Sequence, residues 1–223
     1  MQKYVYLQYG IIRHNMIKDA LYQLDNTPFT LDVLASIYPN CKQITDKARR
    51  LEQEGRIIRL KRGLYVRSGD DNASPDTRLM ANHIYGPSYV SCLSALRQYG
   101  LVPERLFETV SMCTKRSRSF DTPFGRFSYY SISNPYFALG IRMQNEGSGQ
   151  FLVASPEKAL CDLMTVTSGL VFQSAKELAA YLEEDLRMDT DALKDFDAGL
   201  LEACRDAAMV KPRNIAILIK LLK

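Results

Sequence analysis

The chain has 223 residues and a net charge of +4, with 46% hydrophobic and 24% charged residues. This composition is ordinary for a soluble globular protein, and the length allows one large or two modest domains. The five cysteines lie far apart without a CxxC pair, which argues against a zinc site or a disulfide framework and favours reduced, buried thiols. The N-terminal stretch lacks the apolar core of a signal peptide, and the sequence has no run of about eighteen apolar residues. We therefore expect a cytoplasmic protein without a membrane partner.

The first predicted elements are helices. One is expected over residues 15–24. Thr30 is a suitable N-cap for a second helix, and Phe29 and Leu34 are spaced to form a hydrophobic staple across its start. The turn-forming residues 38–40 then end that helix and lead into a third one.

The third helix and the hairpin after it carry much of the basic charge. Ile44, Ala48 and Leu51 fall on one helix face, so this face is expected to be buried. The outward face carries Lys42, Gln43, Asp46, Arg49, Arg50 and Gln53. After Gly55 the pattern alternates, as in a β-hairpin with its tip at residues 61–63. Its two predicted faces consist of Ile58, Leu60, Leu64 and Val66 on one side, and Arg59, Lys61, Tyr65 and Arg67 on the other.

This order of elements predicts a winged helix-turn-helix domain over residues 1–67. The domain contains twelve Lys or Arg residues against six Asp or Glu residues, so the basic charge of the chain is concentrated there. A basic helix beside a basic hairpin tip fits a major groove and its flanking phosphates. The residues expected to contact DNA are Lys42, Gln43, Asp46, Arg49 and Arg50 on the helix, and Arg59, Lys61 and Arg62 on the wing. The alternative is a winged helix that binds protein, in which these charges form a solvated face.

The polar stretch 68–77 is predicted to be a linker, and residues 78–223 a second domain. This domain is expected to begin with helices over 78–85 and 91–99, followed by strands over 107–113, 127–132 and 150–154. From Ser155, a predicted N-cap followed by Pro156, the chain is expected to be helical. The further predicted helices cover 174–184, 191–197, 200–208 and 213–222. The predicted fold class is thus α+β, with an N-terminal winged helix-turn-helix and a mixed α/β C-terminal domain with a helical tail.

Two further clusters each have two interpretations. Lys115, Arg116 and Arg118, with Arg126 on the next strand, either extend a phosphate-contacting surface or form an exposed connection between strands. Glu157, Lys158 and Asp162 lie at a helix start, where an acid/base site is conceivable. However, Lys158 and Asp162 are spaced for an i, i+4 ion pair and Glu157 for the positive end of the helix dipole, so the structural interpretation is favoured.

The sequence contains none of the motifs that indicate catalysis. His14 and His83 are isolated from other ligand or base candidates, and no Walker loop, nucleophile elbow or HExxH is present. We expect no catalytic residue, no metal site and no cofactor.

Four short motifs in order resemble the AbiEi-type antitoxins. They are Arg-Leu-Lys-Arg-Gly-Leu-Tyr-Val at 59–66, Ser-Cys-Leu-Ser-Ala-Leu at 91–96 leading to Gly-Leu-Val-Pro at 100–103, Thr-Pro-Phe-Gly at 122–125, and Ser-Pro-Glu-Lys-Ala-Leu-Cys-Asp at 155–162. The resemblance covers the chain to about residue 165. It implies an autorepressor that binds double-stranded DNA repeats in its own promoter, and an antitoxin whose partner toxin resembles a nucleotidyltransferase.

The sequence thus predicts a DNA-binding repressor and antitoxin. Three alternatives remain: a protein-interaction module on a winged-helix scaffold, a free-standing regulator without a toxin, and an enzyme acting on nucleic acid through Glu157, Lys158 and Asp162.

Overall fold

Two β-sheets and the helices around them make this chain a mixed α+β protein, as the sequence predicts. The computed structural model describes residues 20–68, 76–103, 107–146 and 149–222. The chain divides into two units, Met1–Pro75 and Asp76–Lys223. The predicted linker lies mostly outside the described residues, as do His14 and the first half of the helix predicted over 15–24.

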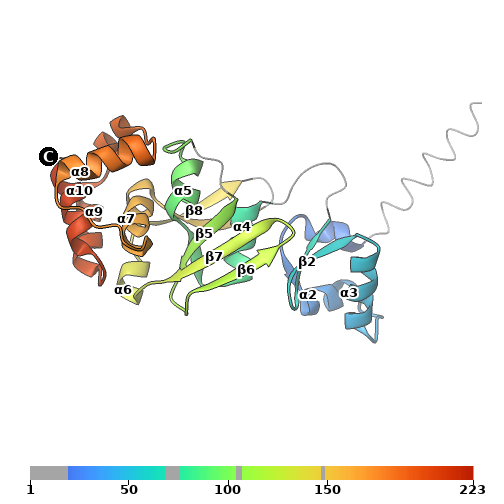
Figure 1. Cartoon of the computed structure of the whole chain (residues 1–223). Helices are drawn as coiled ribbons and strands as arrows, with labels where there is room; N and C mark the ends of the chain where they lie inside the picture. The colour runs from blue at the N-terminus through green and yellow to red at the C-terminus, as the bar shows by residue number, and fades with distance from the viewer. Residues whose placement is uncertain (1–19, 69–75, 104–106, 147–148, 223) are drawn as a thin grey trace, which may run out of the picture. The chain divides into compact units, whose positions relative to one another are not determined.

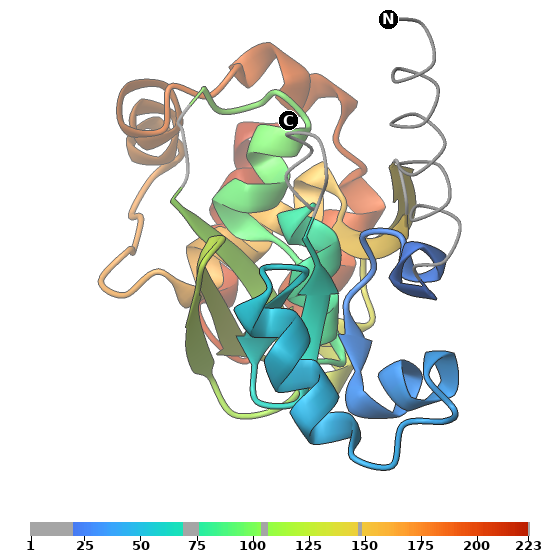
Figure 2. The ribbon, with the colours of Figure 1, turned by 90° about the vertical axis from the view of Figure 1, so that its right-hand side faces the viewer.

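The first unit is built from short helices and a three-stranded antiparallel sheet with the strand order β1-β3-β2. Its elements are η1 (Ala20–Leu24), β1 (Phe29–Thr30), α2 (Leu31–Ile37), α3 (Ile44–Gln53), β2 (Ile57–Lys61) and β3 (Leu64–Arg67). Thr30 is the N-cap of α2, as predicted. In Figure 2, α3 lies beside the hairpin formed by β2 and β3.

One apolar cluster forms the core of this unit. Its buried members are Leu21, Phe29, Leu34, Ala48, Leu51, Ile57 and Tyr65. Ala48 and Leu51 on α3 are therefore buried as their spacing predicts, with Ile44 packed against the same cluster. Phe29 and Leu34, the predicted staple, both belong to it.

The hairpin is confirmed, but its predicted two faces are partly wrong. Tyr65 was assigned to the outward face, yet it is only 5% exposed and stacks on Phe29. The reason is β1, a strand that is not among the predicted elements. It pairs with β3, so Phe29 lies opposite Tyr65 and β3 is the central strand. Ile57 instead of Ile58 packs in the core cluster, and the register shifts between Arg59 and Lys61.

The described part of the predicted first helix is also different from expectation. Residues Ala20–Leu24 form a 3-10 helix, η1. Leu21 is its buried residue and belongs to the core cluster. Leu21 thus anchors this 3-10 helix in the core of the first unit.

The second unit contains a six-stranded mixed sheet with the order β6-β7-β5-β4-β9-β8. Its strands are β4 (Ser88–Val90), β5 (Glu108–Cys113), β6 (Arg118–Thr122), β7 (Gly125–Ser131), β8 (Ile141–Glu146) and β9 (Gly149–Ala154). The pairs β5–β7 and β4–β9 are parallel, and the other neighbours are antiparallel. The predicted strands are confirmed as β5, β7 and β9, while β4, β6 and β8 were missed.

Helices of the second unit form layers on the sheet. The helices are α4 (Thr77–Ile84), α5 (Cys92–Gln98), α6 (Asn134–Phe137), α7 (Pro156–Val166), α8 (Ala175–Ala180), η2 (Tyr181–Asp185), η3 (Thr190–Asp195), α9 (Ala198–Ala207) and α10 (Pro212–Leu221). α7 contacts the sheet strand β9 and α5 on one side, and α9 and α10 on the other. Figure 1 shows α8, α9 and α10 beyond α7, which is therefore enclosed within this unit.

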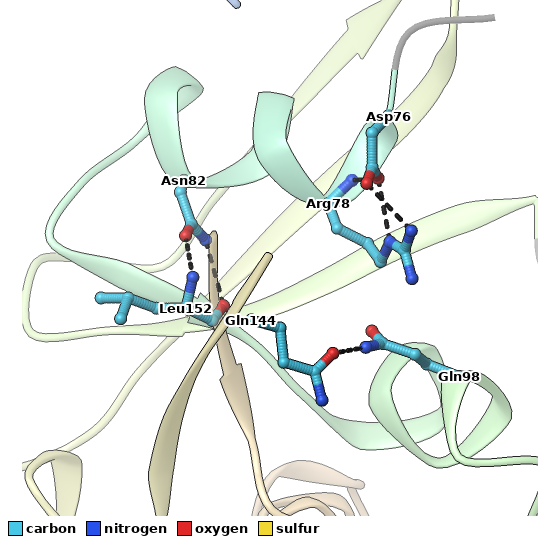
Figure 3. A network of polar contacts seen from close by, with 6 residues as sticks. All are labelled: Asp76, Arg78, Asn82, Gln98, Gln144 and Leu152. Carbon is cyan, nitrogen blue, oxygen red and sulfur yellow. Dashed lines mark hydrogen bonds and ion pairs between the residues drawn. The ribbon is translucent and has the colours of Figure 1, made fainter. Parts of the chain in front are cut away.

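Polar contacts join α4 and α5 to the sheet (Figure 3). The Asn82 amide on α4 accepts a hydrogen bond from the Leu152 N–H at 2.5 Å and donates one to the Leu152 carbonyl at 3.4 Å. It therefore pairs with β9 as a strand backbone would. The Asp76 carboxylate caps α4 and holds the Arg78 guanidinium at 2.9 Å, while Gln98 on α5 donates to Gln144 on β8. Among the described residues, no helix has both the length and the hydropathy that a bilayer span requires.

Candidate nucleic-acid interface

The predicted interface begins just before α3. Lys42 and Gln43 were predicted to lie on the helix itself, but Gln43 is its N-cap and Lys42 precedes it. Both side chains are exposed. The first residues of a recognition helix are those that reach base edges in helix-turn-helix complexes. Their position at the start of α3 is therefore compatible with the predicted role.

α3 presents one face to solvent because its other face is anchored in the core. Ala48 is 1% exposed and Leu51 is completely buried. The Lys47 ammonium lies over the Tyr38 ring, 4.7 Å from its centroid. Lys47 thus braces the helix against the preceding turn, while Arg49 and Arg50 are exposed.

The tip of the hairpin is a two-residue turn. Lys61 pairs with Leu64 across it, so Arg62 and Gly63 occupy the turn. Gly63 has a φ of 77°, in the left-handed region that glycine adopts without steric cost. Arg62 projects from this turn and is exposed, whereas Lys61 is half-buried.

Two of the predicted arginines are already paired within the unit. The Arg59 guanidinium on β2 lies 2.5 Å from the Glu52 carboxylate on α3 and also packs over the Tyr65 ring. The Arg49 guanidinium lies 3.5 Å from the Asp46 carboxylate on the same helix. The Arg59–Glu52 pair joins α3 to the hairpin, so Arg59 positions the two elements relative to each other. Sequence reasoning missed Glu52, whose partnership depends on the packing of α3 against β2.

Three residues of the predicted interface, Lys42, Arg50 and Arg62, carry a positive charge that is not paired within the unit. Within the part of the chain that the structure describes, no acidic side chain pairs with any of these three exposed cations. Lys42 and Arg50 lie at and along α3, and Arg62 lies at the hairpin tip. Exposed cations without an internal partner are available for phosphate groups.

The second basic set lies in the other unit, and three of its members have contacts of their own. The Lys115 ammonium donates to the Gly86 carbonyl at 2.5 Å. The Arg118 guanidinium lies over the Phe120 ring at 5.0 Å, and that of Arg126 lies 3.6 Å from the Glu108 carboxylate. Arg116 is exposed. These contacts favour the interpretation of an exposed strand connection, with Arg118 at the start of β6.

The cluster on α7 is buried, and two of its members, Lys158 and Asp162, pair with each other. Ser155 caps the helix and Pro156 follows it, as predicted. The Lys158 ammonium lies 2.6 Å from the Asp162 carboxylate, and both side chains are completely buried. The other Asp162 oxygen accepts hydrogen bonds from Ser91 at 2.5 Å and Tyr89 at 3.0 Å. The i, i+4 pair is therefore confirmed, and it has no opening to a substrate.

Two tyrosine rings pack against this pair. The Lys158 ammonium lies 3.1 Å from the centroid of the Tyr136 ring, which stabilises the cation. Burial, followed by the nearby Asp162 charge, raises the pKa of Tyr89, and the same two causes raise the pKa of Tyr136. The Tyr89 hydroxyl therefore stays protonated and donates to Asp162. Glu157 is also buried, with one oxygen accepting from the Asp197 N–H.

The cysteines are free thiols, as expected, and four of the five are buried. Burial raises the pKa of Cys92, as does the nearby Asp162 charge, so this thiol stays protonated. No protein-family model matches the chain, and no curated protein shows significant similarity to it.

Proposed function

We propose that the first unit is a winged helix-turn-helix and that the chain is a DNA-binding transcriptional autorepressor. α2 and α3 with the turn between them form the helix-turn-helix, and β2 with β3 forms the wing. The observation that carries this proposal is the set of exposed, unpaired cations Lys42, Arg50 and Arg62 at the start of α3, along it and at the hairpin tip.

The geometry supports different roles for the individual residues of this surface. Gln43 at the helix start has an amide that matches the adenine edge in the major groove. Arg50 and Arg62 supply charge for phosphates on either side of the groove. Arg59 holds the wing against α3 through its ion pair with Glu52. It therefore helps to fix the position of the wing relative to α3.

The resemblance of the four motifs supports the finer part of the proposal, an antitoxin of the AbiEi type. The repressor then binds repeats in its own promoter, and a neighbouring gene encodes a nucleotidyltransferase-like toxin. Co-expression of this chain with that neighbour tests the antitoxin role: restored growth supports it, and unchanged toxicity contradicts it. Neither outcome of this test bears on whether the chain binds DNA.

The direct test of DNA binding is fluorescence anisotropy of the full chain on the duplex just upstream of its own gene. A shuffled duplex of the same composition is the control, and both are titrated at low and at physiological salt. We expect binding to the native duplex to survive the higher salt, while binding to the shuffled duplex is lost. Equal affinity for the two duplexes would exclude a specific repressor.

A further inference from the structure

Two hollows lie side by side on the second unit. One has a volume of about 520 Å³ and the other about 570 Å³, and Tyr130 and Val166 line both of them. Phe107 lines the second hollow, while Met209 and Val210 line the first. These five residues and the two hollows between them form one continuous surface, here termed the apolar face.

Large apolar side chains stand out of this face. Phe107 is 85% exposed, Met209 83%, Val210 51% and Tyr130 37%. Large contiguous apolar surfaces are rare on monomeric proteins and mark sites of association. Phenylalanine, tyrosine and methionine are also the residues that are enriched at the centres of protein interfaces.

The face is almost free of charge. Eleven residues line each hollow and two are shared, so the face comprises twenty residues, among which Glu108 is the one Asp, Glu, Lys or Arg residue. With 24% charged residues in the chain, roughly five would be expected among twenty residues of average composition. The carboxylate of Glu108 is itself engaged, because Ser128 donates a hydrogen bond to it and Arg126 lies nearby. Most of the remaining lining residues are apolar or carry hydroxyl groups.

These features match a second copy of the same chain. In a twofold-symmetric interface the same patch meets itself, so a charged patch would bring like charges together, whereas an uncharged one does not. Prominent Phe107 and Met209 side chains beside hollows also provide both the projections and the recesses that self-complementarity requires. Three of the twenty residues, Cys92, Tyr136 and Leu163, are buried. The other seventeen are exposed or half-buried, which is close to the roughly 20–30 residues on one side of a standard-size interface.

We propose that the chain forms a twofold-symmetric homodimer through the apolar face of its second unit. This association goes beyond the proposed DNA binding and does not require DNA. Phe107 and Met209 are the anchors, and each occupies a hollow of the partner copy. Because the interface is apolar, the dimer persists at high salt, in contrast to an association driven by surface charges.

Sedimentation velocity of the full chain without DNA tests this proposal over about 1–100 µM, a range that covers dissociation constants typical of reversible dimers. We expect the mass to rise with concentration from the 25.3 kDa of the monomer towards twice that value. The rise should be the same at 0.15 M and at about 0.5 M salt. A monomer throughout this range overturns the proposal and leaves the face to a different partner.

Substitutions locate the interface. Met209→Asp and Phe107→Ser should each raise the dimer dissociation constant at least about tenfold, since both residues are anchors at its centre. Met143→Asp is the matched control, because Met143 is 65% exposed on β8 and lies outside the face. Both substituted side chains at the face are highly exposed, so the fold, checked by circular dichroism, should be retained. If Met143→Asp weakens the dimer as much as Met209→Asp, the apolar face is not the interface.

Discussion

At the scale of single residues, Lys158 and Asp162 form a completely buried ion pair in the second unit. Both side chains are inaccessible, and Asp162 has three partners through its two oxygens. Burying two charges has a larger desolvation free energy than forming an ion pair at the surface. A buried pair is therefore stable only when its charged groups have hydrogen-bond partners. Tyr89 and Ser91 donate hydrogen bonds to Asp162, and the Tyr136 ring lies against the Lys158 ammonium.

Asp162→Asn should therefore destabilise the chain strongly, by about 3–5 kcal/mol, because it leaves the Lys158 charge buried without its counter-ion. Urea denaturation measures this as a lower transition midpoint. Asp191→Asn is the control, since the Asp191–Lys194 pair has the same chemistry but is 85% and 79% exposed; it should have little effect. Equal shifts for the two variants would show that burial does not govern the Asp162 pair.

The same argument predicts the behaviour of a double variant. Replacing both partners, as in Lys158→Met with Asp162→Leu, removes the uncompensated charge. The double variant should therefore be more stable than Asp162→Asn alone. A double variant less stable than the single one would indicate that packing around the pair, and not its charge, is responsible.

Different residues of the proposed DNA interface should have different effects on DNA binding. Arg62→Ala should weaken binding to native and shuffled DNA alike and reduce the salt slope by about one, because Arg62 contributes one phosphate contact. Gln43→Ala should chiefly reduce the preference for the native duplex. Anisotropy titrations at several salt concentrations measure both, with Arg213→Ala, an exposed arginine on α10, as the control. Equal losses on both duplexes from both variants would contradict this division.

At the scale of elements, the hairpin tip depends on one backbone conformation. Gly63 adopts a φ of 77°, and a Cβ placed there would meet no atom within 4 Å. A substitution therefore costs only backbone strain, without a steric clash. Gly63→Ala should destabilise the first unit by roughly 1–2 kcal/mol, the cost of the left-handed conformation for a residue with a Cβ.

Gly63→Asn is the matched comparison, because asparagine tolerates this conformation better than alanine. We expect its thermal midpoint to lie between those of the wild type and Gly63→Ala. An alanine variant as stable as the wild type would mean that the turn relaxes to another type.

At the scale of the whole molecule, DNA binding and dimerisation are assigned to different units and should be separable. Arg62→Ala should leave the sedimentation behaviour unchanged. Met209→Asp should retain binding to the native upstream duplex, but the binding curve should become less steep, because the two copies no longer bind as one body. Anisotropy and sedimentation on the same preparations measure both effects. Loss of dimerisation in Arg62→Ala would contradict the assignment.

The sequence by itself determined the local features. The spacing of Ala48 and Leu51 predicted the buried side of α3, Gly63 and its neighbours predicted the hairpin, and the i, i+4 spacing predicted the Lys158–Asp162 pair. Ser155 and Pro156 predicted where α7 begins. Each of these depends on residues within a few positions of one another, where helical and strand periodicity apply directly.

Tertiary structure alone decided the features that join distant segments. β1 pairs with β3 and thereby buries Tyr65, and Ser91 and Tyr89 reach Asp162 from more than seventy positions away. The Arg59–Glu52 pair and the apolar face, which unites Phe107 with Met209, likewise arise only when the elements are packed. Periodicity shows which side of an element is buried, but it does not show which other segment covers it, because that choice depends on non-local packing.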